Sequence, residues 1–158
     1  ERTAMELLTL CKTSLVALTI NEASDIVGPQ NLLLPNLICA VTGFPNLASL
    51  RLDCIDLEST SGGLSRAFLH GDCNIKTLEL HKTDPSQELF DVLQGCKTLE
   101  RFDIDEVCVT GRQFQDICNS IAKSKSSFQH VLLYIWANLG SPDTIDLISM
   151  GAMIASQK

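Results

Sequence analysis

The sequence predicts an α/β solenoid (horseshoe) of about five strand–helix units, with a parallel sheet on the concave side and helices on the convex side. The pattern Leu-x-x-Leu-x-Leu, with Ile, Val or Phe at some anchors, occurs five times. Segments with an apolar residue every three or four positions lie between the copies, as helices require. Aromatic residues make up only 5% of the 158 residues, so the core must be aliphatic.

The five copies of the pattern set the predicted strands. The spacings between first anchors are 32 residues (15 to 47), 28 (47 to 75), 24 (75 to 99) and 29 (99 to 128). The last two anchors of each copy alternate, as on one face of a strand, and one such strand cannot fold alone. Stacking the units side by side therefore makes a continuous core from these anchors: Leu15, Leu18, Ile20; Leu47, Leu50, Leu52; Ile75, Leu78, Leu80; Leu99, Phe102, Ile104; and Phe128, Val131, Leu133.

The segments between the strands are predicted as helices at 36–41, 61–69, 85–93 and 110–122. Pro85 suits a first helical turn, and Thr110 is a suitable N-cap. Gly43, Gly71 and Gly95 stand where helices would end, as C-terminal caps do.

The two ends differ from the middle of the chain. Residues 1–12 are predicted to be the helix of a truncated preceding repeat, and 141–158 a C-terminal capping helix. A capping unit is typical of the end of a solenoid. We therefore predict a single domain over 1–158 that comes from the C-terminal end of its solenoid.

Strand–helix repeats of about 28 residues resemble the ribonuclease-inhibitor-like class of leucine-rich repeats over nearly the whole chain. That class includes ribonuclease inhibitor, GTPase-activating proteins, actin-capping tropomodulin-like proteins and NACHT-type (NOD-like) innate immune receptors. An incomplete start, a C-terminal cap and irregular repeats are most similar to the last group. The resemblance implies a ligand-sensing or autoinhibitory region of an innate immune receptor; the alternative is a scaffold or regulator, such as an adaptor, GTPase regulator or actin-associated protein.

One feature of the family pattern is missing. The family usually has Asn or Cys three residues after the third anchor, where the side chain bonds the turn backbone. This sequence has Ala23, Ile55, Thr83, Val107 and Trp136 at those positions. We therefore expect no polar ladder and a less regular solenoid.

Charge and cysteine content limit the partners and the compartment. The formal net charge of −7 disfavours nucleic acid, and no stretch of about 18 apolar residues predicts a membrane span. Seven cysteines, without C-x-x-C spacing, argue against a disulfide scaffold or zinc site and suggest buried thiols in a cytoplasmic protein.

Side chains between the anchors are expected to face away from the core, on the concave sheet. Arg51, Glu79, Arg101, Asp103 and Asp105 would form a central charged band, either a solvated sheet face or a patch for a basic partner. Leu132, Tyr134 and Trp136 are candidate interface anchors, although Trp136 could instead pack under the cap helix. The complete predicted partner-binding set is Arg51, Asp53, Glu79, His81, Arg101, Asp103, Asp105, His130, Leu132 and Tyr134.

No set of residues predicts catalysis, and we expect neither a cofactor nor a metal. His81 and His130 would lie two strands apart, roughly 10 Å, too far for a shared ion. Asp103 and Asp105 share a face but lie among charges that suggest no pocket. The expected partner is a protein or another domain of the same chain, with self-association through an exposed edge strand as a further expectation.

Overall fold

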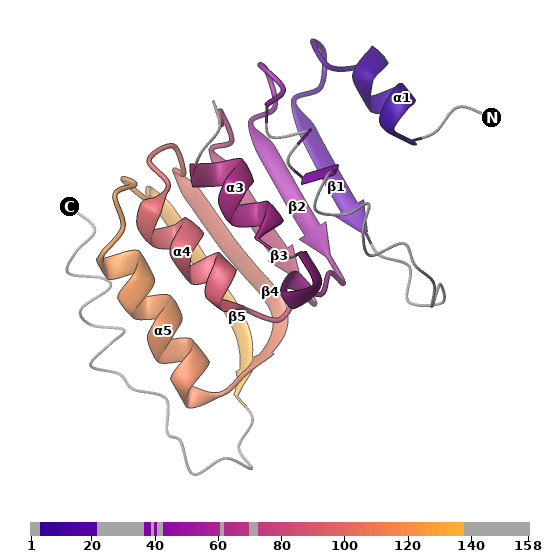
Figure 1. Ribbon diagram of the computed structural model, residues 1–158. Helices are drawn as coiled ribbons and strands as arrows, with labels where there is room; N and C mark the ends of the chain where they lie inside the picture. The colour runs from indigo at the N-terminus through magenta and orange to yellow at the C-terminus, as the bar shows by residue number, and fades with distance from the viewer. Residues whose placement is uncertain are drawn as a thin grey trace.

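The computed structural model describes residues 4–21, 37–38, 40, 43–60, 62–69 and 73–137 (Figure 1). Five strands form one parallel sheet in the order β1-β2-β3-β4-β5, each beside its neighbour in sequence. The elements in chain order are α1 (Ala4–Leu10), β1 (Ala17–Asn21), β2 (Ser49–Asp53), the 3-10 helix η2 (Leu57–Thr60), α3 (Gly63–Leu69), β3 (Thr77–His81), α4 (Gln87–Gly95), β4 (Arg101–Val109), α5 (Gly111–Ala122) and β5 (His130–Ala137). The predicted α/β repeat architecture is confirmed.

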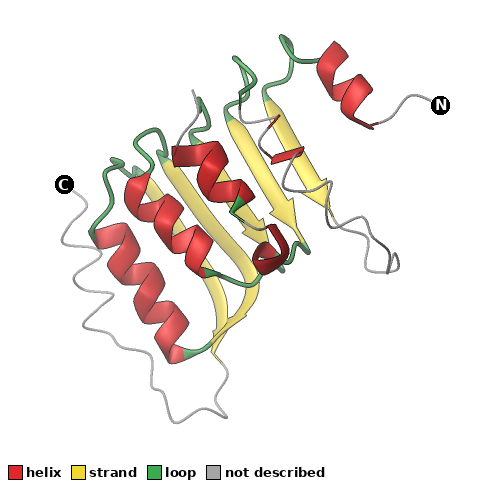
Figure 2. Ribbon diagram, in the orientation of Figure 1, coloured by secondary structure: helices red, strands yellow, loops and turns green. Residues whose placement is uncertain are grey.

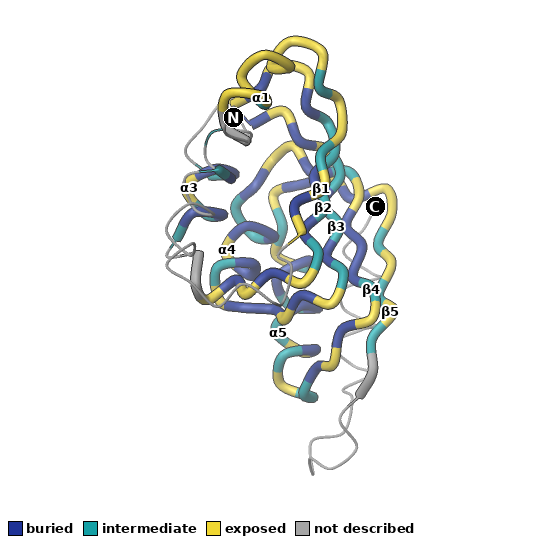
Figure 3. The backbone as a smooth tube through the Cα atoms, turned by 90° about the vertical axis from the view of Figure 1, so that its right-hand side faces the viewer, coloured by how far each residue is buried: buried dark blue, intermediate teal, exposed yellow. Residues whose placement is uncertain are grey.

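The strand register follows the repeated pattern. Second anchors align across all five strands, as do third anchors, in two rows: Leu18, Leu50, Leu78, Phe102 and Val131; and Ile20, Leu52, Leu80, Ile104 and Leu133. These anchors are buried in β2, β3 and β4, whereas Leu18, Val131 and Leu133 at the outer strands are only half-buried. The core therefore thins toward both edges, and α1 with its following turn is largely exposed (Figure 3).

Helices α3, α4 and α5 form a layer on one face of the sheet (Figure 2). Gly95, predicted as a C-terminal cap, is instead the last residue of α4, and Cys96 after it has an extended backbone. A Cβ at position 95 would lie 2.7 Å from Leu69 Cδ2 of α3. The glycine thus leaves room for the Leu69 side chain of the neighbouring helix, which a larger residue would displace. Gly43 is exposed in a turn, and position 71 lies outside the described residues.

The other helix predictions have mixed outcomes. Thr110 is the N-cap of α5, as expected, and forms a capping box with Gln113, whose side chain accepts from the Thr110 N–H. Helix α4 begins two residues after Pro85. Of the predicted helix at 36–41, positions 37, 38 and 40 are described and are helical, while the predicted cap at 141–158 lies outside the described residues. No described helix is long and apolar enough to cross a membrane.

The prediction of no polar ladder is wrong at one turn. Thr83 is fully buried, and its hydroxyl accepts from the N–H of Ile55 (3.2 Å) in the preceding repeat. The same hydroxyl lies 3.0 Å from the His81 carbonyl oxygen and 3.2 Å from that of Leu52. Threonine can replace the expected residue because a hydroxyl both donates and accepts.

A second row of polar contacts lies where the strands begin. The side-chain amide of Asn46 donates to the Thr13 carbonyl (2.6 Å), and Asn74 repeats this contact with Pro45 one unit later (3.3 Å). These asparagines come just before the first anchors Leu47 and Ile75, so the turns that enter the strands are bonded from repeat to repeat.

Three equivalent residues at the strand ends adopt the left-handed conformation: Cys54, Lys82 and Glu106, with φ of 55°, 49° and 54°. After Cys54 and Lys82 the chain leaves the sheet. Glu106 is instead a bulge within β4, because pairing with β5 resumes at Val107. The bulge extends β4 beyond β2 and β3 and reverses its inside–outside alternation.

Candidate partner-binding face

The face of the sheet opposite α3, α4 and α5 carries the predicted binding residues; we call it the open face. No helix among the described residues covers it (Figure 2). All ten predicted residues lie in strands at positions that alternate with the buried anchors. In pairing order they form three rows: Ala17, Ser49, Thr77, Arg101 and His130; Thr19, Arg51, Glu79, Asp103 and Leu132; and Asn21, Asp53, His81, Asp105 and Tyr134.

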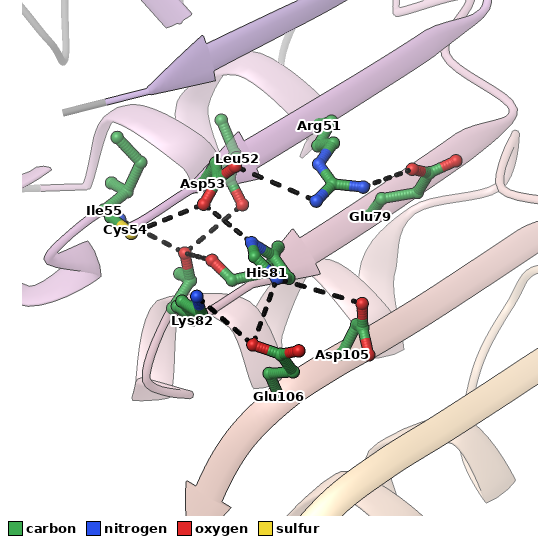
Figure 4. Close-up of polar contacts among 11 residues, drawn as sticks. Arg51, Leu52, Asp53, Cys54, Ile55, Glu79, His81, Lys82, Asp105 and Glu106 are labelled. Carbon is green, nitrogen blue, oxygen red and sulfur yellow. Dashed lines mark hydrogen bonds and ion pairs between the residues drawn. The ribbon is translucent and has the colours of Figure 1, made fainter. Parts of the chain in front are cut away.

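His81 lies at the centre of an acidic cluster that spans three strands (Figure 4). Its Nδ1 is 2.8 Å from Asp53 Oδ1 on β2, while its Nε2 lies 3.5 Å from Glu106 and 3.9 Å from Asp105 on β4. The hydrogen bond from His81 is the main cause that lowers the pKa of the Asp53 carboxyl from its usual 3.8. The imidazole therefore links β2 to β4 through side chains.

Two further residues extend this cluster and were not part of the predicted set. Glu106 pairs with Lys82 (3.2 Å), and this contact raises the pKa of the lysine ammonium. Both residues adopt the left-handed backbone conformation at equivalent strand ends, so their side chains lie at corresponding places on neighbouring strands. An alignment of the repeats on positions 53, 81 and 105 would identify Lys82 and Glu106, because each directly follows an open-face residue.

The two arginines of the open face are already paired. Arg51 lies 3.8 Å from both Asp53 and Glu79. Arg101 forms an ion pair with Asp103 on its own strand, which raises the pKa of the guanidinium. The charged band is therefore a set of specific pairs within and across strands.

Asp103 is more buried than the prediction of a solvated sheet face implies, because only 6% of its surface is exposed. Its Oδ2 accepts from Arg101 Nε (2.7 Å), whereas its Oδ1 makes no hydrogen bond to any described residue. His130 Nε2 stands 3.6 Å from that oxygen, too far for a hydrogen bond. A buried carboxylate oxygen without a donor is unfavourable, and such groups are rare in folded proteins.

The inference that Asp103 and Asp105 suggest no pocket is wrong. Together with Leu132 and Tyr134 they line a hollow of about 450 Å³ on the open face. Arg51, Glu79, Leu80, His81 and Arg101 complete its lining. The sequence did not predict the hollow because its depth depends on the conformation of each side chain on the sheet.

The apolar part of this hollow is exposed. Leu132 and Tyr134 expose 46% and 52% of their surface, as expected for candidate interface anchors. The side chain of Trp136 lies outside the described part of the structure. Its two alternatives, interface or cap packing, stay predictions.

The six described cysteines are less buried than expected, and Cys39 lies outside the described residues. Cys73, Cys96 and Cys118 are buried, but Cys11, Cys54 and Cys108 are exposed. Cys108 faces outward because the bulge at Glu106 turns Val107 and Val109 inward instead. Burial raises the pKa of the Cys73 thiol, so this residue is a poor nucleophile.

Comparison with known proteins supports the fold. No protein-family model and no curated protein matches the chain. Among solved structures, the tropomodulin C-terminal domain of Caenorhabditis elegans is similar with a TM-score of 0.66 at 12% sequence identity. The match covers 98% of this chain and 92% of the other. At this identity the likeness concerns the fold.

Proposed function

We propose that the chain is a protein-interaction domain that binds a polypeptide partner on its open face and catalyses no reaction. The hollow on that face carries this proposal, because it joins charged groups to the exposed side chains of Leu132 and Tyr134. Aromatic anchors beside polar groups are typical of the centres of protein interfaces. Among the described residues no group of three or more His, Cys, Asp or Glu could hold a metal ion.

Within this proposal, a scaffold or regulator, such as an actin-associated protein, is favoured over an immune receptor. Support for this comes from the structural similarity to a tropomodulin C-terminal domain over nearly the full length of both chains. The alternative as the sensing region of a NACHT-type receptor has no comparable support and stays a prediction from the sequence. Cytoplasmic location remains a proposal from the cysteine content of the sequence.

Site-specific photo-crosslinking would test the binding face. A benzophenone amino acid is placed at Thr77 on the open face or at Asp91 on the exposed side of α4, and crosslinked partners are identified by mass spectrometry. We expect a partner crosslinked from position 77 and absent from position 91. Changing Leu132 and Tyr134 to Ser should abolish that crosslink.

The matched control is Leu7→Ser, an equally exposed apolar residue on α1 away from the hollow. It should leave the crosslink from position 77 unchanged. Crosslinks found from position 91 alone would place the partner on the helix layer. A crosslink from position 77 that the double change at 132 and 134 leaves intact would show that these two side chains do not bind the partner. Either result would contradict the proposal.

A further inference from the structure

We propose that the hollow between β3 and β5 is a receptor for one arginine side chain of a partner polypeptide, held by Asp103 and Asp105 and stacked on Tyr134. This inference rests on the proposed function and names the chemistry that its partner would present.

The first support is the Oδ1 atom of Asp103, which is buried without a hydrogen bond to any described residue. This side chain is nine-tenths buried and lines the hollow, yet its Oδ1 has no hydrogen-bond donor within the described structure. The adjacent Arg101 and His130 side chains expose 47% and 50% of their surface, so both can move to admit a ligand. An incoming N–H group would supply the donor that the carboxylate lacks.

The second support is the charge of the hollow. Its lining includes the cations Arg51 and Arg101 and the carboxylates Glu79, Asp103 and Asp105. Each arginine is paired with a carboxylate, so among the described residues Asp105 has no arginine or lysine partner, and the nearest ring nitrogen of His81 lies 3.9 Å away. The carboxylates of the hollow therefore outnumber its arginines, and the Oδ1 atom of Asp103 lacks a hydrogen bond to any described residue. The complementary ligand is a cation.

The third support is the geometry, which favours arginine over lysine. Asp103 and Asp105 are two residues apart on β4, about 6–7 Å between Cα atoms, and point to the same face. A guanidinium has five N–H donors in a fixed plane and can bond two carboxylates at once, whereas an ammonium acts as a point charge.

The register places an aromatic wall beside these carboxylates. Leu132 pairs with Asp103 and Tyr134 with Asp105, so the apolar and acidic pairs lie side by side on β5 and β4. A planar guanidinium bonded to Asp105 can stack on the Tyr134 ring, and Leu132 can cover the aliphatic stem. The volume of about 450 Å³ also leaves room for residues flanking the arginine, which favours a chain segment over a free ion.

Nuclear magnetic resonance titration of the whole chain tests this inference. The probe is a blocked pentapeptide with a central arginine between two leucines, and the comparison peptides carry lysine or glutamine at the centre. We expect saturable shifts of the Asp103 and Asp105 carboxyl carbons and the Tyr134 ring with the arginine peptide. Affinity should be about tenfold lower for lysine and lost for glutamine.

Variants of the carboxylates sharpen the test. Asp105→Asn and Asp103→Asn should each weaken binding by about tenfold or more, while the exposed loop residue Asp84→Asn should not. The more exposed Asp105 keeps the test valid if Asp103→Asn fails to fold. Equal binding of the arginine and lysine peptides, binding of the glutamine peptide, or full affinity in the Asp105 variant would overturn the inference. If the crosslink from position 77 persists in that case, the proposed function stands without the arginine receptor.

Discussion

The buried hydroxyl of Thr83 is the sharpest test of how the repeats hold together. Thr83→Val keeps the shape of the side chain and its strand preference but removes its only polar atom. The N–H of Ile55 then loses its acceptor inside the core, and the nearby carbonyls of Leu52 and His81 lose a donor. The change therefore affects the junction between two repeats and little else.

The expected cost follows from these contacts. A buried N–H left without an acceptor costs about 1–3 kcal/mol, and the lost donation to a carbonyl costs about 0.5–1.5 kcal/mol more. The hydroxyl has one proton, so it can donate to only one of the two carbonyls at a time. We expect Thr83→Val to lower the free energy of unfolding by about 2–4 kcal/mol, a large share of the stability of a typical domain.

Urea unfolding followed by circular dichroism measures this difference. The control is Thr77→Val on the open face of β3, where the side chain is half-buried and the same substitution should change the free energy of unfolding by less than about 0.5 kcal/mol. A Thr83→Val protein within about 0.5 kcal/mol of the unchanged chain would refute the assignment of Thr83 as a bonded rung between repeats.

Three further changes test other elements by urea unfolding. Thr110→Ala removes the capping box of α5 and should cost about 1 kcal/mol; the same loss in a Thr110→Ser protein would contradict the cap. Gly95→Val should cost about 1–3 kcal/mol because its side chain meets Leu69, and much less in a Leu69→Ala background. Because the hydrogen bond from His81 lowers the pKa of Asp53 in the folded chain, the stabilisation from this carboxylate is present above about pH 4 and is lost as pH falls further; the stability gap to Asp53→Asn should therefore narrow as pH falls below about 4, and a gap independent of pH would contradict this.

The sequence was sufficient for the strands because their signal is periodic. Each anchor pair that alternates in the sequence is buried in the structure or packed against the core, and the register between strands follows the same positions. The turns were harder to predict. Thr83 departs from the family pattern in residue type, but its hydroxyl performs the same task of bonding the turn backbone. The spacing of Gly95 predicts a cap, because sequence spacing does not show that Leu69 of the neighbouring helix lies beside this position.

The open-face residues were also predictable, since alternation along a strand decides which face a side chain occupies. The extent to which each of these side chains is buried was not predictable. Asp103 and Asp105 are equivalent in the sequence pattern, yet one carboxyl is nine-tenths buried and the other exposes 46%. The difference depends on neighbours from three strands, including Arg101 on the same strand and Leu132 across from it. The bulge at Glu106, which exposes Cys108, likewise has no periodic signal.

The order of charges across the sheet supports the proposal that the hollow binds a cation. In the row Arg51, Glu79, Asp103, the first pair is favourable, but Glu79 and Asp103 are like charges directly opposite on neighbouring strands. Such a pair is destabilising, and a cation at either position would remove the repulsion. Arg101 compensates Asp103 from its own strand, but Oδ1 has no hydrogen bond to any described residue. A cation arriving from a partner would bond that oxygen and offset the repulsion at the same time, so the local cost in the unbound sheet becomes a gain on binding.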